Sequence, residues 1–151
     1  MTLLYILVVV ATFFFMEGVA WFTHKYIMHG FLWSWHKSHH TYHKHPLERN
    51  DLFALVFSAP AILCIVIGYE IKGWELLKFV GFGITSYGIF YFLFHDILVH
   101  RRIKIKFVAR NGYLKRIMKA HYVHHKIHSK EGAEAFGFLY APKKYSEREK
   151  I

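Results

Sequence analysis

The 151-residue sequence contains a single cysteine, Cys64, which excludes an internal disulfide framework and any cysteine-rich zinc module. Acidic residues are also few: ten Asp and Glu stand against twenty Lys and Arg, which leaves a formal charge of +10. Glu-x-x-His pairs, flavin or nicotinamide fingerprints, internal repeats of the solenoid kind and low-complexity linkers are all missing. These absences exclude a carboxylate-bridged di-iron bundle and a chain that carries its own organic redox cofactor.

Apolar residues make up 54% of the chain, and Phe, Trp and Tyr alone account for 19%. This content rules out disorder, and a small soluble domain would struggle to bury so many aromatic side chains. Three stretches, about 3–22, 52–69 and 74–99, are long enough to cross a bilayer as helices. Their apolar character on all faces argues against a soluble bundle. The sequence therefore predicts an all-α integral membrane helical bundle, a single domain over residues 1–151.

The basic residues predict the orientation of these spans. Eighteen of the twenty Lys and Arg lie in segments 23–51 and 100–151, which the positive-inside rule makes cytoplasmic. The N-terminus is then outside and the C-terminus inside. The first span contains Glu17 and lacks both a basic n-region and a small-residue cleavage site, so we expect it to be retained. In the tail, residues 113–128 predict a helix near the membrane surface, which favours contact with anionic lipid over nucleic acid.

Ten of the thirteen histidines form two copies of one pattern, H-x4-H followed by H-x2-H-H. The first copy consists of His24, His29, His36, His39 and His40, and the second of His95, His100, His121, His124 and His125. Residues at i, i+3 and i+4 share a helix face, so each H-x2-H-H presents three imidazoles to one side. Its adjacent pair is fanned about 100° apart, which allows the two neighbours to serve different metal ions.

The H-x4-H spacing places its two side chains about 140° apart on a regular helix. We therefore expect such a pair to straddle two ions, or to sit at a fraying helix end, rather than to chelate one ion. Alternating spans bring all four groups to the same membrane face. This arrangement predicts one dinuclear site with roughly five imidazoles for each ion, although imidazole suits iron, zinc, copper and nickel alike.

Two carboxylates are candidates for a supporting role behind the ligands. Glu17 lies seven residues before His24, on the same helix face, and a carboxylate within a span is usually functional. We expect Glu17 to orient a ligand imidazole or its backbone neighbourhood. Asp96 is adjacent to His95 and has either a similar role or only solvation at the helix end.

Several other residues receive a structural interpretation. The histidines outside the repeated pattern are interpreted as ordinary core or surface residues: His43, His45 and His128. Three glycines of the third span are interpreted as sites of close helix packing: Gly81, Gly83 and Gly88. Aromatic residues near the motifs are candidates to line a substrate groove, although packing or interface anchoring explains any single one better: Trp21, Phe22, Phe31, Trp33, Trp35, Tyr91 and Phe94.

Five segments (24–40, 50–57, 91–102, 112–126 and 130–142) resemble the fatty acid hydroxylase/sterol desaturase superfamily of membrane di-iron oxygenases. The histidine motifs resemble the superfamily, and the residues around them resemble its carotenoid-hydroxylating branch. The resemblance implies that the ten histidines hold two non-haem iron ions, with O2 as co-substrate. It implies hydroxylation of β-ionone rings, from β-carotene through cryptoxanthin to zeaxanthin, with no catalytic residues beyond the metal ligands.

The implied setting is the inner membrane of a bacterial cell, with the active site facing the cytoplasm. An external electron donor, such as a ferredoxin, is implied because the chain lacks a nucleotide-binding fingerprint. Two alternatives stay open: a fatty acyl or sterol hydroxylase or desaturase of the same superfamily, and a non-enzymatic membrane protein that binds or transports metal. A transporter places its ligands near the midplane of the spans, whereas these histidines gather at one end.

Overall fold

The computed structural model describes residues 1–41 and 47–146. Over these residues it is helical and contains no strand, which confirms the predicted fold class. Its elements in chain order are α1 (Thr2–Phe22), η1 (Thr23–Phe31), α2 (Trp33–His36), η2 (Lys37–His40), η3 (Arg49–Asp51), α3 (Leu52–Glu70), α4 (Leu76–Tyr91), η4 (Phe92–Val99), α5 (Gly112–His125) and η5 (Lys143–Ser146). The π-helices η1 and η4 continue α1 and α4 without a break, and the other η elements are 3-10 turns.

Three helical segments are long and apolar enough to cross a membrane: Thr2–Phe31, Arg49–Glu70 and Leu76–Val99. The three predicted spans are therefore present. The first extends beyond its predicted end at residue 22 because η1 prolongs α1. Large apolar side chains cover the outer surface of the spans, for example Phe15 at 71% and Leu55 at 66% exposure. Such a surface suits contact with lipid rather than with water.

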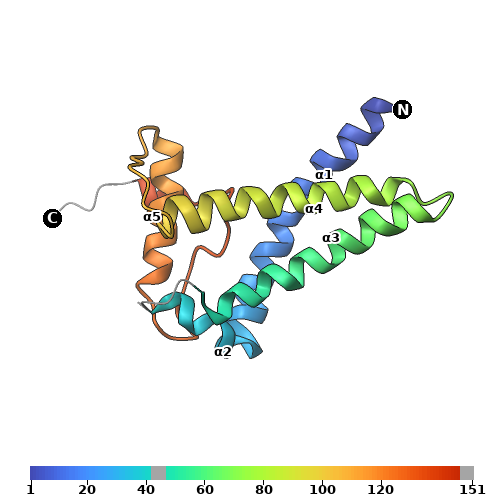
Figure 1. Ribbon diagram of the computed structural model, residues 1–151. Coiled ribbons are helices and arrows are strands. Elements are labelled where there is room, and N and C mark those ends of the chain that lie inside the picture. Colours follow the sequence, from blue (N-terminus) through green and yellow to red (C-terminus); the bar gives the residue numbers. More distant parts are fainter. Residues whose placement is uncertain (42–46, 147–151) are drawn as a thin grey trace.

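Helix α4 packs against both α1 and α3, and two of its glycines permit the close approach (Figure 1). A Cβ atom on Gly81 would lie 2.7 Å from the carbonyl oxygen of Ala61 in α3. A Cβ atom on Gly83 would lie 2.8 Å from the carbonyl oxygen of Val9 in α1. The packing role predicted for these two glycines is confirmed. It is wrong for Gly88, where a Cβ atom would meet no described atom within 4 Å.

The end of α1, the start of α3 and the end of α4 lie at one end of the bundle, opposite the α3–α4 turn (Figure 1). Helix α5 crosses this end, across the direction of α4. It begins where the Asn111 side chain accepts the Leu114 N–H at 2.7 Å, and it ends at His125, three residues before its predicted end. The topology therefore brings the four histidine motifs to the same end, as predicted.

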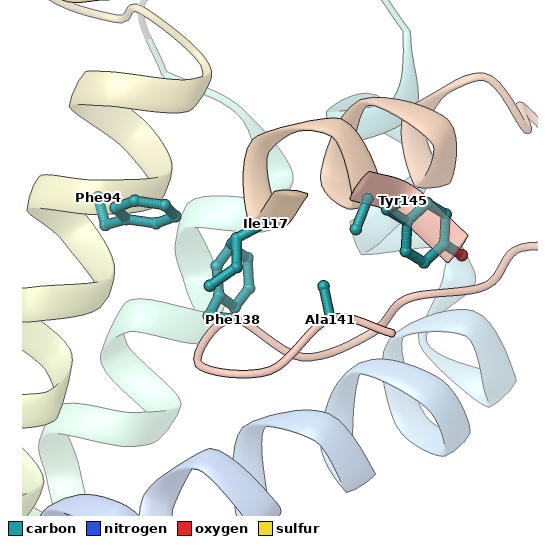
Figure 2. Packing of buried hydrophobic residues seen from close by; sticks show 6 residues of the cluster. Phe94, Ile117, Phe138, Ala141 and Tyr145 are labelled. Carbon is teal, nitrogen blue, oxygen red and sulfur yellow. The ribbon is translucent and has the colours of Figure 1, made fainter. Parts of the chain in front are cut away.

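A small hydrophobic cluster attaches the C-terminal segment to α5 and η4; its members are Phe94, Ile117, Ala120, Phe138, Ala141 and Tyr145 (Figure 2). Phe138 is only 2% exposed, and its ring centroid lies 5.0 Å from that of His95 and 5.2 Å from that of His121. This packing holds residues 127–141 against the histidines, so that their backbone can take part in the site.

Candidate metal centre

The structure gathers all ten patterned histidines into two adjoining groups. The first cluster consists of His24, His29, His36, His40 and His124, and the second cluster of His39, His95, His100, His121 and His125. Within each cluster, one ring nitrogen from every member lies within 4.8 Å of the others. Eight of the ten residues are buried and the other two are half-buried. Two groups of five imidazoles match the predicted arrangement, and each is able to bind a metal ion.

The H-x4-H pairs depart from the expected geometry. His24 and His29 both belong to the first cluster, and His95 and His100 both belong to the second, so neither pair straddles the two. The reason is the π-helical backbone of η1 and η4, in which the His100 N–H donates to the His95 carbonyl oxygen at 2.9 Å, an i→i−5 bond. A wider turn brings residues five apart onto one face, and such π-helical turns often occur at functional sites.

The H-x2-H-H motifs behave as predicted, because each divides its members between the clusters. His36 and His40 belong to the first cluster, whereas His39 between them belongs to the second. The other motif does the reverse, with only His124 in the first cluster. In both motifs the i and i+4 residues stay together and the i+3 residue faces the other group. The adjacent pairs therefore link the two clusters, as their fanned geometry predicts.

Backbone carbonyl oxygens lie behind most rings of the first cluster. The Nδ1 atoms of four rings lie 2.8–3.0 Å from carbonyl oxygens of Phe136, Lys130, Ile127 and Glu134. Ala135, between two of these carbonyls, has a φ of 62°, which is uncommon for a residue with a side chain. This left-handed residue turns the chain so that the carbonyls on either side of it both reach ring nitrogens.

The same contacts show that the first cluster suits a cation. A carbonyl oxygen can only accept, so each Nδ1 facing one carries the proton and leaves a lone pair on Nε2. The Nε2 atoms of His29 and His40 nevertheless lie 3.2 Å apart, and those of His29 and His124 lie 3.3 Å apart. Lone pairs this close repel unless a positive ion lies between them. Imidazole nitrogens bound to one ion at about 2.0–2.1 Å each lie at most about 4.2 Å apart, so these separations fit a shared ion.

The second cluster has the same close approach. The Nε2 atoms of His39 and His95 lie 2.9 Å apart, and so do those of His100 and His121. Nε2 of His125 is buried and has no hydrogen-bond partner among the described residues. Buried ring nitrogens are normally hydrogen-bonded or bound to metal. The donor set of each cluster therefore fits one metal ion.

Burial keeps rings of the two clusters that lie outside the spans neutral. Desolvation lowers the pKa of His40 and that of His100 to about 4 each. The pKa of His124 falls to about 3, first through burial and then through the neighbouring His40. The uncharged imidazole is the form that binds a metal. At pH 7 these rings are therefore ready to act as ligands.

Three residues that the sequence analysis did not single out support the clusters. Oε1 of Glu48 lies 2.8 Å from Nδ1 of His39, and Oδ1 of Asn50 lies 2.7 Å from Nδ1 of His36. Arg102 donates to Glu48 at 2.6 Å across 54 positions of sequence. The only available signal was their place close to the histidine motifs, and no spacing rule connects Glu48 with Arg102.

The two predicted supporting carboxylates occupy different positions. Oε1 of Glu17 accepts the N–H groups of Phe138 and Leu139 at 2.7 and 2.8 Å, and Oε2 accepts the Tyr87 hydroxyl at 2.7 Å. Glu17 therefore contacts the backbone near the clusters rather than an imidazole. Oδ2 of Asp96 lies 3.4 Å from Nδ1 of His95, beside a ligand candidate.

The histidines outside the pattern are placed apart from both clusters or are not described. His128 is exposed and belongs to neither cluster. The positions of His43 and His45 lie outside the described residues.

A cavity of about 490 Å³ extends from the histidines between α1, α3 and α4. Its wall includes His24 and Asp96 at the metal end and Gly88 in α4. Of the aromatic residues predicted to line a groove, Tyr91 does so, whereas Trp33 packs on the His29 ring with centroids 5.0 Å apart. The others are absent from the described lining, and for them packing or interface anchoring stays the better interpretation: Trp21, Phe22, Phe31, Trp35 and Phe94.

The fold and the site together define a helical protein with three membrane-spanning segments and a paired histidine centre at one end of them. The profile of the family described as fatty acid hydroxylase matches residues 9–141. The chain belongs to this family, whose members are oxidoreductases.

Curated relatives are similar over most of the chain. A beta-carotene hydroxylase of Pseudescherichia vulneris is 50% identical over 91% of this chain and 77% of its own length. A beta-carotene hydroxylase of Paracoccus sp. (strain PC1) is 44% identical over 90% of this chain and 83% of its own length. The chloroplastic beta-carotene 3-hydroxylase 1 of Arabidopsis thaliana is 37% identical, over 87% of this chain and 43% of that protein. No solved structure matches the chain.

Proposed function

We propose that this protein hydroxylates the β-ionone rings of carotenoids, converting β-carotene through cryptoxanthin to zeaxanthin with O2. The observation that carries the proposal is the apolar cavity that leads to the first cluster. The names of the curated relatives support the same substrate class.

The cavity suits a hydrocarbon that enters from the bilayer. Its volume of about 490 Å³ lies within the range usual for ligand pockets, roughly 300–1,000 Å³. Ile62, Ile89 and Phe92 line it and are also 50–58% exposed, so the cavity meets the outer surface of the spans. No Lys or Arg is among its described lining residues, which disfavours an acyl substrate with an anionic head group.

We propose that the two clusters hold two iron ions through their ten histidines. When bound there, iron supplies the activation of O2 that an unactivated ring C–H bond requires. The protein's own residues hold the neutral rings in place through the carbonyls, Glu48 and Asn50, and the apolar wall keeps water from the reacting carbon. No residue outside the ligands is assigned a catalytic role.

We further propose that the histidine end faces the cytoplasm of a bacterial cell and receives electrons from a separate acidic protein. The basic segments of the chain support this orientation. Helix α5 carries three ligand candidates on its inner side and exposes Lys115, and Lys126 directly follows it, also exposed. A donor protein on that surface would lie about one helix diameter, roughly 10–12 Å, from the ligands.

The test is expression in cells that accumulate β-carotene, followed by pigment analysis and measurement of iron in the purified protein. We expect cryptoxanthin and zeaxanthin, and about two iron ions for each chain. His39→Ala and His124→Ala should each abolish hydroxylation and lower the iron content, whereas the exposed His128→Ala serves as the matched control and should retain both.

Each alternative predicts a different outcome of this experiment. Protein in the membrane with two iron ions but unchanged pigments would contradict the carotenoid substrate and favour an acyl or sterol substrate. Metal uptake without oxygen consumption would favour a non-enzymatic metal-binding protein. Full activity of His39→Ala or His124→Ala would refute their assignment as ligands.

A further inference from the structure

The two clusters are supported by groups of different charge. In the first cluster, four Nδ1 atoms face backbone carbonyls and the fifth, that of His36, faces the neutral amide of Asn50 at 2.7 Å. In the second cluster, Nδ1 of His39 lies 2.8 Å from Glu48 and Nδ1 of His95 lies 3.4 Å from Asp96. The first cluster thus has neutral acceptors at all five rings, whereas two rings of the second cluster face carboxylates.

The carboxylates near the second cluster form a connected network. Arg102 contacts Glu48 and Asp51 at 2.6 Å each, and its Nε lies 3.1 Å from Asp96. The Glu48 side chain is only 4% exposed, and it also accepts the Ser38 hydroxyl at 3.1 Å. Among the described residues, three carboxylates thus surround one guanidinium.

The 3-10 turn η3 and the residue before it provide hydrogen-bond partners to histidines of both clusters. Glu48, at its N-cap, points to the second cluster and Asn50, two residues later, contacts His36 of the first. Asp51 closes the turn by accepting the Glu48 N–H at 2.9 Å. The charged group facing His39 and the neutral group facing His36 therefore lie in one short segment, so single substitutions at Glu48 and Asn50 can reverse their charges.

A carboxylate that accepts a ring N–H makes the opposite nitrogen a stronger ligand than a neutral acceptor does. Negative charge in a poorly solvated site also stabilises the more highly charged ion. We propose that Glu48, held by Arg102, is a positioning residue that makes the two halves of the centre unequal. The second cluster binds its iron more tightly and in the more oxidised state, and the first cluster's iron is reduced first. This inference rests on the two-iron centre of the proposed function.

The experiment uses the full-length iron-loaded protein in detergent and follows iron release against increasing chelator. In the wild type we expect two release steps of equal size, a looser step from the first cluster and a tighter step from the second cluster at higher chelator concentration. Glu48→Gln keeps an oxygen that faces His39 but removes its charge, and it should move the tighter step to about 10–100-fold lower chelator concentration. The looser step should stay in place. Mössbauer spectra during reductive titration should show the two ions reduced closer together than in the wild type.

Asn50→Asp is the reciprocal variant, since it places a carboxylate against His36 of the first cluster. It should move the looser step toward the tighter one, and it tests the inference even where Glu48→Gln does not fold. Equal shifts of both steps in Glu48→Gln, or unchanged steps in Asn50→Asp, would overturn the inference. Wild-type protein with fewer than two iron ions would contradict the two-iron centre itself and the inference with it.

Discussion

Glu17 offers the sharpest test of how the membrane-spanning helices support the two histidine clusters. Its carboxylate accepts the Tyr87 hydroxyl and the N–H groups of Phe138 and Leu139 at 2.7–2.8 Å. Tyr87 and Phe138 are 3% and 2% exposed, so Glu17→Ala leaves at least two buried donors without an acceptor. A buried donor left in this way costs about 1–3 kcal/mol, which gives a loss of about 2–6 kcal/mol.

The loss should act on the metal centre as well as on stability. The segment that Glu17 holds also supplies the carbonyls of Glu134 and Phe136, which face His124 and His24. We therefore expect Glu17→Ala to unfold at a lower temperature in detergent and to release iron from the first cluster at lower chelator concentration. A loss of this size is a large part of a typical folding free energy of about 5–15 kcal/mol.

Two milder variants separate the hydrogen bonds from the rest of the side chain. Tyr87→Phe removes one donor and leaves both backbone bonds, so it should cost only about 1.5–3 kcal/mol and retain iron. Glu17→Gln retains one oxygen acceptor, so its loss of stability should lie between those of Tyr87→Phe and Glu17→Ala. Thermal unfolding and iron content, measured together for the three variants, give the order of their effects on stability and iron retention. Wild-type stability and iron retention in Glu17→Ala would refute the reasoning.

Two further predictions concern the cavity and the pH dependence. Gly88→Leu adds a side chain to the cavity wall and should lower carotenoid hydroxylation by roughly tenfold or more while iron stays bound. Gly18→Leu, on the exposed side of α1, should leave both hydroxylation and iron content unchanged. Equal turnover in the two variants would contradict the placement of the substrate. His40 and His100 have pKa values of about 4 when folded and 6.5 when unfolded, so the unfolded chain takes up protons first as the pH falls. Stability and iron retention should therefore decrease from about pH 6.5 toward pH 4, and iron binding that stays constant over this range would argue against these rings as ligands.

The sequence was sufficient for the spans, for the gathering of ten histidines at one end and for the division of each H-x2-H-H motif. These features depend on local periodicity, on hydropathy and on alternating topology, which a sequence contains directly. The roles of Glu48 and Arg102 were not predictable in this way, because a contact between residues 54 positions apart depends on how η3 and the end of η4 pack. The backbone carbonyls that face the first cluster could not be predicted from the sequence, since every residue has one.

For the H-x4-H motifs the predicted helix geometry was wrong, although the predicted gathering of the histidines at one end was correct. A regular helix turns residues five apart away from each other, and on that basis His24 and His29 would be divided between two ions. The π-helical backbone of η1 reverses this, and Gly30, with φ −102° and ψ −123°, interrupts the helix directly after the second histidine. A π-helical turn has little local preference of its own and is favoured when the side chains that it aligns share a partner. The five-residue spacing and the widened turn together place both rings of a pair in the same cluster.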